Sequence, residues 1–265
     1  MKVLELALNA ALRAGEKILE VYNDPDSDFS VERKADNSPL TIADKISHSV
    51  IEAYLNESPY PVLSEEGRTI TYNERKNWKN FWLVDPLDGT KEFIKRNGEF
   101  TVNIALVKNG SPVMGVIYVP VTRTLYFGQQ EIGAWKIEQV APGANLIFED
   151  LKEKGTKLPI VNSERKFTVV GSRSHSNEET AAYIAQLEKE HGEIEIMSKG
   201  SSLKICMVAE GSADVYPRFG PTMEWDTAAG HAIAVAAGKN VTLADHKTSL
   251  KYNKENLLNP FFIVH

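Results

Sequence analysis

Cysteine is nearly absent from this sequence. Cys206 is the single cysteine among 265 residues, so the chain cannot close an internal disulfide. A protein that folds without disulfides is typical of a reducing compartment, and we expect a cytoplasmic location. Cys206 lies in an apolar stretch, residues 203–209, with no histidine beside it. This setting indicates a buried structural thiol and argues against a cysteine nucleophile.

Long apolar runs are also missing. No stretch approaches the roughly 20 apolar residues that a transmembrane helix needs. The first residues carry charge early, at Lys2 and Glu5, unlike a secretory signal peptide. The sequence therefore predicts no transmembrane segment. A peripheral contact with the cytoplasmic face of the inner membrane stays open, and nothing in the sequence fixes the oligomeric state.

An excess of basic residues is missing as well. The 30 lysines and arginines stand against 36 aspartates and glutamates, which gives a net charge of −6. Surfaces that bind polymeric nucleic acid usually carry a basic excess, so we expect a small-molecule partner and no polymeric nucleic acid. A small anionic ligand is compatible with this balance where a metal ion or a local basic cluster offsets the acids.

Apolar periodicity predicts an α/β protein with a first half of helices and strands, residues 1–140, and a second half, residues 165–265, in which the two alternate. Residues 141–164 between them hold two glycines and two prolines among mixed charges, which indicates a linker or an irregular excursion. The expected helices are 2–22, 42–56, 178–191, 201–210 and 226–237. The expected strands are 61–67, 81–84, 100–107, 113–119, 124–127, 132–137, 167–170, 194–197, 213–216 and 241–243.

The most informative segment is Asp85-Pro86-Leu87-Asp88-Gly89-Thr90, which follows the apolar run at 81–84. Pro86 has no N–H and a fixed φ, so the strand cannot continue through it as a central member of a sheet. Gly89 permits a tight turn and a close approach of the backbone to a ligand. Two carboxylates, a carbonyl, N–H groups and a hydroxyl thus meet at one strand end. That set suits divalent metal ions and a phosphate.

Each acid near this segment also has a purely structural explanation. Asp-Pro and Asp-Gly are common turn formers. Asp44 lies three residues after Thr41, as in a capping box, and Asp226 stands where a helix begins. Glu65 fits a solvated charge in a turn.

Taken together, however, the acids form a set that offers only oxygen ligands. They are Glu65, Asp85, Asp88 and Asp226. Oxygen ligands suit hard cations, above all Mg²⁺. If a helix opens at Gly89, its first N–H groups can bind an anion, the Thr90 hydroxyl can contact a metal-bound water, and Asp44 can accept the proton. Asp44 then has a capping role and a chemical role, and the sequence does not decide between them.

Two blocks resemble the signatures of the inositol monophosphatase superfamily, whose members are Mg²⁺-dependent, lithium-sensitive phosphomonoesterases. The blocks are Trp82-Leu83-Val84-Asp85-Pro86-Leu87-Asp88-Gly89-Thr90 and Glu224-Trp225-Asp226-Thr227-Ala228-Ala229-Gly230. Further similarity at 34–44 and 63–66 extends the resemblance over nearly the whole chain. The resemblance implies a layered α/β/α/β/α fold, with an α+β N-terminal half, an α/β C-terminal half and the site between them.

Within the superfamily, the chain is similar to bacterial 3′(2′),5′-bisphosphate nucleotidases, through residues 171–175, 200–204 and 216–226. Those enzymes hydrolyse adenosine 3′,5′-bisphosphate to AMP and phosphate, which clears a by-product of sulfate assimilation. Some of them accept 3′-phosphoadenylyl sulfate. Inositol monophosphatase or a related sugar phosphatase, and a non-catalytic metal or nucleotide sensor on the same fold, stay as alternatives.

The resemblance also implies a metal site. Glu65, Asp85 and the Leu87 carbonyl would bind one Mg²⁺. Asp85, Asp88 and Asp226 would bind a second, with Asp85 shared between the two ions. A third, weaker ion would involve Glu65 and a water held by Asp44.

Catalytic and substrate contacts follow from the same resemblance. Thr90 with Asp44 would activate the attacking water. The residues implied to contact the substrate are Glu65, Leu87, Asp88, Gly89, Thr90, Ser172, His175, Ser201, Lys204, Arg218 and Asp226. For a second phosphate we favour Lys204 and Arg218. A solvated helix face for Lys204, simple packing for Arg218, and an ordinary loop position for His175 are the alternatives.

Overall fold

The structure, a computed structural model, describes residues 2–34, 39–161, 164–171 and 177–265. None of the helices in these ranges is long and apolar enough to cross a membrane. The helices are α1 (Lys2–Tyr22), α2 (Ile42–Leu55), α3 (Tyr72–Arg75), α4 (Thr90–Ile94), α5 (Phe148–Lys154), α6 (Glu178–His191), α7 (Leu203–Glu210) and α8 (Glu224–Ala236). The strands are β1 (Glu32–Arg33), β2 (Pro39–Leu40), β3 (Val62–Ser64), β4 (Asn80–Asp88), β5 (Thr101–Lys108), β6 (Ser111–Val119), β7 (Thr124–Gln129), β8 (Gly133–Ile137), β9 (Thr156–Leu158), β10 (Thr168–Gly171), β11 (Glu195–Ser198), β12 (Tyr216–Arg218), β13 (Val241–Leu243) and β14 (Phe262–Val264).

The largest sheet is buried on both faces. Its seven strands lie in the order β3-β4-β5-β6-β7-β8-β9, with β3 parallel to β4 and the other neighbours antiparallel. On β4, Trp82 and Val84 pack into the core beneath α1 and α2, whereas Phe81 and Leu83 pack into the core that contains α7 and α8. Because successive side chains alternate between two covered faces, residues 81–84 form an unbroken apolar run.

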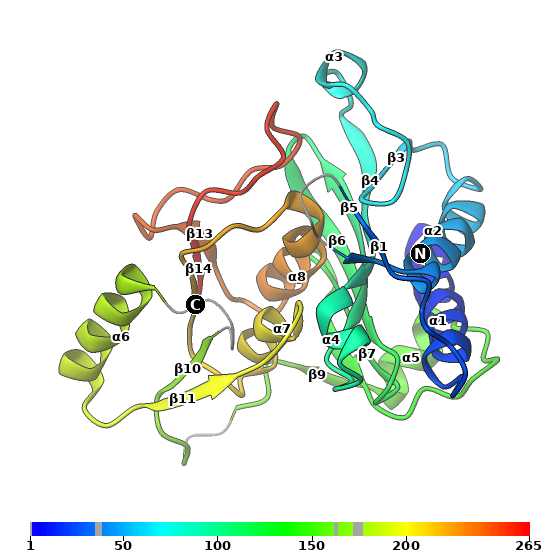
Figure 1. Cartoon of the computed structure of the whole chain (residues 1–265). Coiled ribbons are helices and arrows are strands. Elements are labelled where there is room, and N and C mark those ends of the chain that lie inside the picture. Colours follow the sequence, from blue (N-terminus) through cyan, green and yellow to red (C-terminus); the bar gives the residue numbers. More distant parts are fainter. Residues whose placement is uncertain (1, 35–38, 162–163, 172–176) are drawn as a thin grey trace.

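Five layers follow from this arrangement, as Figure 1 shows. Helices α1 and α2 cover one face of the seven-stranded sheet, and α7 and α8 cover the other. Strands β10 to β14 lie beyond α7 and α8, and α6 forms the outermost layer against them. The α/β/α/β/α layering implied by the family resemblance is confirmed.

The strands of the last sheet layer are short and of mixed direction. β10 and β11 pair in parallel, and β12, β14 and β13 form an antiparallel group in that order. An isolated bridge between Val169 and Val215 joins the two groups. The strand expected at 213–216 is therefore reduced to that bridge and begins as β12 only at Tyr216. The central strand of the antiparallel group, β14, was not predicted from the sequence.

The expectation of a linker or irregular excursion at 141–164 is wrong for its middle part. Residues 148–154 form α5, and residues 156–158 form β9, which pairs with β8 and extends the large sheet. Phe148 and Leu151 are spaced for one helical face and are buried in the core beneath α1. This short apolar pattern is enough to form a helix despite the glycines and prolines around it. The division of the chain at about residues 140 and 165 stays a prediction.

Strand β4 is longer than expected and ends at the carboxylates. It runs through Pro86 to Asp88, but its pairing with β5 shifts between Asp85 and Asp88, so Pro86 and Leu87 have no opposite residue on β5. Pro86 thus lies in a strand without serving as a ladder member, as its missing N–H requires. Gly89 follows with φ +96°, a conformation that suits glycine, and α4 starts at the next residue.

One glycine sets the distance between the large sheet and α8. A Cβ placed on Gly115 of β6 would lie 2.1 Å from the backbone oxygen of Ala229 in α8. We expect Gly115→Ala to destabilise the protein by about 1–3 kcal/mol through overpacking. Urea unfolding measures the effect. Gly171→Ala is the matched control, because a Cβ there meets nothing within 4 Å, and equal losses for both variants would contradict this account.

Candidate active site

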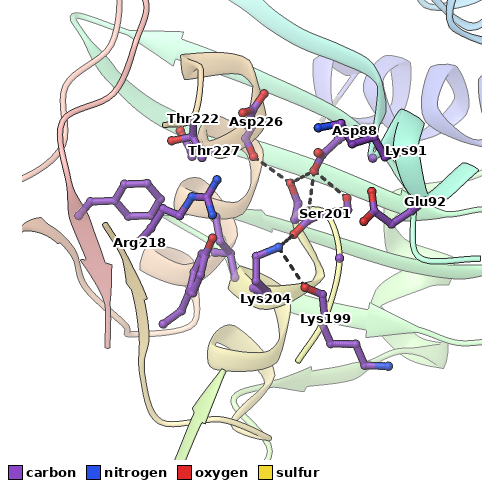
Figure 2. Close-up of a pocket in the computed structure, with 16 residues that line it drawn as sticks. Asp88, Lys91, Glu92, Lys199, Ser201, Lys204, Arg218, Thr222, Asp226 and Thr227 are labelled. Carbon is purple, nitrogen blue, oxygen red and sulfur yellow. Dashed lines mark hydrogen bonds between the residues drawn. The ribbon is translucent and has the colours of Figure 1, made fainter. Parts of the chain in front are cut away.

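Part of the implied site lines one pocket, where the end of β4 meets the first turns of α7 and α8: Asp88, Gly89, Ser201, Lys204, Arg218 and Asp226. Figure 2 shows a pocket at this junction, with Asp88 on one side and Arg218 and Lys204 on the other. Asp226 and Ser201 also line it. The structure therefore brings acids from the first and second halves of the chain to one place. Ser172 and His175, which were predicted to contact the substrate, lie outside the described residues.

Asp44 performs its capping contact and its contact with Thr90 at the same time. Its Oδ2 accepts hydrogen bonds from the Thr41 N–H (2.8 Å) and the Thr41 hydroxyl (2.5 Å) at the start of α2. Its Oδ1 lies 3.2 Å from the Thr90 hydroxyl, which donates to it. Burial raises the pKa of Asp44. The two roles that competed in the sequence are divided between two oxygens of one carboxylate.

Asp85 is a buried acid of the site. It is only 2% exposed, and its Oδ1 accepts a hydrogen bond of 3.1 Å from the Leu87 N–H. Burial raises the pKa of Asp85 well above its usual range, and the negative charges of Glu65, Asp88 and Asp226 raise it further. The four acids, which come from three separate segments, thus act on one another electrostatically.

Lys34 supplies positive charge at the edge of the acidic cluster, a role not predicted from the sequence. Its Nζ lies 2.6 Å from Glu65 Oε1 and also forms an ion pair with Glu66. Burial raises the pKa of Glu65, although Lys34 works in the opposite direction. Its position in the sequence could have indicated this role, because Lys34 is the first residue of the block at 34–44 that resembles the family.

Asp88 is held by the start of α7. Its Oδ2 accepts hydrogen bonds from the Ser201 hydroxyl, the Ser202 N–H and the Ser202 hydroxyl, each at 2.7 Å. The Ser202 hydroxyl also lies 2.8 Å from the backbone oxygen of Asp226. The same hydroxyl oxygen accepts a hydrogen bond of 2.8 Å from Asn103 Nδ2. Ser202 thereby links the two segments that carry Asp88 and Asp226. Neither Ser202 nor Asn103 was predicted as a site residue, although Ser202 is adjacent to the predicted Ser201.

Asp226 occupies the first turn of α8 and is both a cap and a member of the acidic cluster. Its Oδ2 accepts a hydrogen bond of 2.9 Å from the Met223 N–H. Burial raises the pKa of Asp226 well above its usual range, and the charges of Asp88 and Glu65 add to the shift.

The donor chemistry of this cluster fits a hard divalent cation. The cluster offers oxygen atoms only, and the acids raise one another's pKa, so a cation among them would relieve their repulsion. Among the described residues, no group of three or more acids, histidines or cysteines stands ready-made as a metal cage. The acids are thus gathered by the fold, while their side chains point to capping and hydrogen-bond partners.

The opposite wall of the pocket is cationic. Lys204 is 7% exposed, and its Nζ donates to the backbone oxygens of Ser201 (2.6 Å) and Lys199 (3.3 Å). Burial lowers the pKa of Lys204 to about 8. The alternative of a solvated helix face for Lys204 is therefore wrong. Arg218 donates from Nη2 to the Pro221 oxygen at 2.7 Å, and within the described residues its buried Nε has no hydrogen-bond partner.

Comparison with known proteins places these residues in a family context. Residues 1–260 match the inositol monophosphatase family. The chain is 48% identical to the 3′(2′),5′-bisphosphate nucleotidase CysQ of Salmonella typhimurium over 265 residues, which is 99% of each protein. It is 46% identical to the protein of the same name from Escherichia coli K12, again over 99% of each.

Solved structures agree with the sequence comparison. CysQ from Bacteroides thetaiotaomicron, a bacterial member of the inositol monophosphatase family, is 58% identical, with a TM-score of 0.91 over 98% of this chain and 95% of that one. The extragenic suppressor protein suhB from Bartonella henselae has a TM-score of 0.73 at 22% identity, covering 100% of this chain and 93% of that one. This second similarity supports the fold alone.

Removing one buried acid tests the electrostatic description. We expect Asp85→Asn to have a higher melting temperature than the parent at pH 7 without divalent metal, because the substitution removes a buried, repelled charge. Each kcal/mol gained should raise the melting temperature by roughly 2–4 °C. Added Mg²⁺ should raise the melting temperature of the parent and leave the variant nearly unchanged, and the variant should lose phosphatase turnover. Calorimetry with EDTA or Mg²⁺ measures the first two effects. A variant that melts below the parent in EDTA would contradict the account.

Proposed function

This chain belongs to the inositol monophosphatase family, and within that family we propose that it is a 3′(2′),5′-bisphosphate nucleotidase. It hydrolyses the 3′-phosphate of adenosine 3′,5′-bisphosphate and gives AMP and phosphate. The observation that carries the proposal is the pocket with an acidic wall at Asp88 and Asp226 and a cationic wall at Lys204 and Arg218. The names of the CysQ relatives support the same substrate class.

Enzymes of this family are generally dependent on Mg²⁺. We propose that Glu65, Asp85 and the Leu87 carbonyl hold one ion, that Asp85, Asp88 and Asp226 hold a second, and that a third, weaker ion lies near Glu65. When bound, the ions supply positive charge that stabilises the attacking and leaving oxygens of the phosphoryl group. The mutual repulsion of the acids gives this cluster its affinity for cations.

Thr90 and Asp44 form the proton path in this proposal. The Thr90 hydroxyl already donates to Asp44 Oδ1, so Thr90 can take a proton from water on its other side as it passes its own to Asp44. The raised pKa of Asp44 makes this carboxylate a better proton acceptor than an exposed aspartate. We assign the scissile phosphate to the N–H groups of Gly89 and Thr90, where α4 begins after β4.

A second phosphate distinguishes this substrate from inositol monophosphate. Within the described residues, neither Lys204 nor Arg218 forms an ion pair with an acidic side chain, so both charges are available to an anionic ligand. Ser201 lies between these cations and Asp88. We therefore assign the 5′-phosphate to Lys204, Arg218 and Ser201, and propose 3′-phosphoadenylyl sulfate as a further substrate.

A non-catalytic sensor is the weaker alternative. A sensor needs metal and nucleotide contacts but no proton path, whereas this structure keeps the Thr90–Asp44 contact. We propose that the enzyme works in the cytoplasm, where it clears the nucleotide by-product of sulfate assimilation.

Substrate preference tests the proposal directly. We expect kcat/KM for adenosine 3′,5′-bisphosphate to exceed that for inositol 1-phosphate roughly 10-fold or more, because charged hydrogen bonds to the second phosphate contribute about 1.5–3 kcal/mol. Phosphate release in the presence of Mg²⁺ measures both rates, and added lithium should inhibit them. The reverse preference would favour an inositol or sugar phosphatase.

The cationic wall has a test of its own. We expect Arg218→Met and Lys204→Met each to raise KM for adenosine 3′,5′-bisphosphate by roughly 10-fold to 100-fold, because each loses a charged contact to the 5′-phosphate. Adenosine 3′-monophosphate is the matched control, since it lacks that phosphate, and its KM should change little. An equal loss for the two substrates would place these residues elsewhere in the mechanism.

A further inference from the structure

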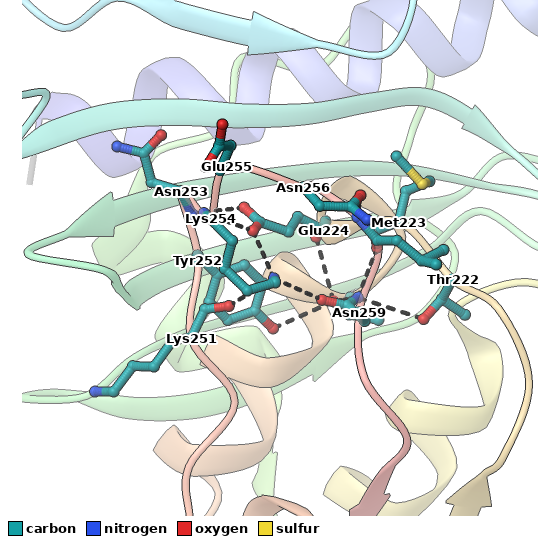
Figure 3. A network of polar contacts seen from close by, with 12 residues as sticks. Thr222, Met223, Glu224, Lys251, Tyr252, Asn253, Lys254, Glu255, Asn256 and Asn259 are labelled. Carbon is teal, nitrogen blue, oxygen red and sulfur yellow. Dashed lines mark hydrogen bonds and ion pairs between the residues drawn. The ribbon is translucent and has the colours of Figure 1, made fainter. Parts of the chain in front are cut away.

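A segment near the C-terminus, residues 251–259, joins the first half of the chain to the start of α8. We call it the C-terminal strap, and Figure 3 shows it beside Glu224. Its Tyr252 N–H donates to the Gly110 oxygen (3.1 Å) at the turn between β5 and β6. Its Tyr252 hydroxyl lies 3.2 Å from the Thr227 hydroxyl in α8. The strap therefore contacts both halves of the molecule.

Arg75 of α3 attaches the strap to the first half. Arg75 is only 2% exposed. Its Nη1 donates to Asn253 Oδ1 (2.8 Å) and to the Lys254 oxygen (2.7 Å). Its Nη2 donates to the Glu255 oxygen (3.0 Å), and Asn253 Nδ2 donates back to the Arg75 oxygen (2.9 Å). A planar guanidinium can satisfy three acceptors in this way, whereas an ammonium cannot match the geometry.

Glu224 attaches the strap to α8. Its side chain is fully buried. A buried carboxylate is costly unless it is well hydrogen-bonded. Glu224 accepts from the Asn253 N–H (2.6 Å), the Lys254 N–H (3.0 Å) and Lys254 Nζ (2.6 Å), as Figure 3 shows. All three donors belong to the strap, so the first residue of α8 is anchored by it.

The end of the strap pairs with the segment just before α8. The Glu224 N–H donates to the Leu257 oxygen (2.9 Å), and the Asn259 N–H donates to the Thr222 oxygen (2.8 Å). Asn259 Nδ2 also donates to the Met223 oxygen (2.9 Å). Met223 in turn donates its N–H to Asp226 Oδ2. A continuous series of contacts thus runs from Arg75 through the strap to the Asp226 carboxylate.

We propose that Arg75 and Glu224 are positioning residues for the metal site. Through the strap they fix the first turn of α8, and with it Asp226, relative to the acids at the end of β4. Neither residue lines the pocket that holds Asp88 and Asp226. The inference rests on the proposed function, because it takes Asp226 to be a metal ligand.

Mn²⁺ binding, followed by the electron paramagnetic resonance of the free ion, tests this inference without relying on turnover. We expect Arg75→Met and Glu224→Gln each to weaken Mn²⁺ binding roughly 10-fold, as is typical when residues that orient metal ligands are changed. The Mg²⁺ concentration for half-maximal activity should rise by the same factor. The double variant should be little worse than either single one, because each change releases the same strap. Arg75→Lys keeps the positive charge but loses the planar set of donors, so we expect it to weaken Mn²⁺ binding less than Arg75→Met does.

A matched control separates positioning from stability. Leu187→Ala empties part of the core beneath α6, far from the strap in Figure 1, and should lower the melting temperature without changing Mn²⁺ affinity. If the strap variants lose melting temperature like Leu187→Ala and keep the parental Mn²⁺ affinity, the strap is structural only and the inference is wrong. If the parent itself binds no Mn²⁺, the proposed metal site is wrong, and the inference fails with it.

Discussion

The fold holds several carboxylates together against their own repulsion. Asp85 is buried at the end of β4, where the charges of Glu65, Asp88 and Asp226 act on it. Such a cluster opposes folding unless hydrogen bonds and cations compensate it. The surrounding structure provides much of that compensation, since Lys34 contacts Glu65, and Ser201 and Ser202 bind Asp88. The rest of the architecture serves to bring these groups together.

Three sheet and helix layers are needed to build the site. β4 carries Asp85 and Asp88, α2 carries Asp44, and α8 carries Asp226. Three of these acids are oriented by a backbone N–H near their own element, Asp44 by Thr41, Asp85 by Leu87 and Asp226 by Met223, whereas Asp88 is held by the start of α7. Local hydrogen bonds therefore set the direction of Asp44, Asp85 and Asp226, and packing of α7 and α8 on the large sheet brings Ser202 and Asp226 to Asp88.

Much of this arrangement could be predicted from the sequence. Strong helical periodicity gave α1, α2 and α6, and the family resemblance, which the comparisons confirm, gave the layered fold. The roles assigned to single acids stay predictions. Features that depend on distant partners were not accessible. β9 and β14 are three residues long and exist because neighbouring strands pair with them. The contacts of Ser202 and Lys34 join segments far apart in the chain, so no local sequence pattern predicts them.

The two oxygens of the Asp44 carboxylate make different contacts, and this limits which substitutions the position tolerates. One oxygen closes the N-terminus of α2 and the other meets Thr90. A substitution that removes the acid therefore weakens a helix and the proposed chemistry in a single event. Selection for expression or solubility alone therefore retains Asp44, even when catalytic turnover is not selected. Sequence libraries sorted only for well-folded clones should consequently remain enriched in an intact Asp44.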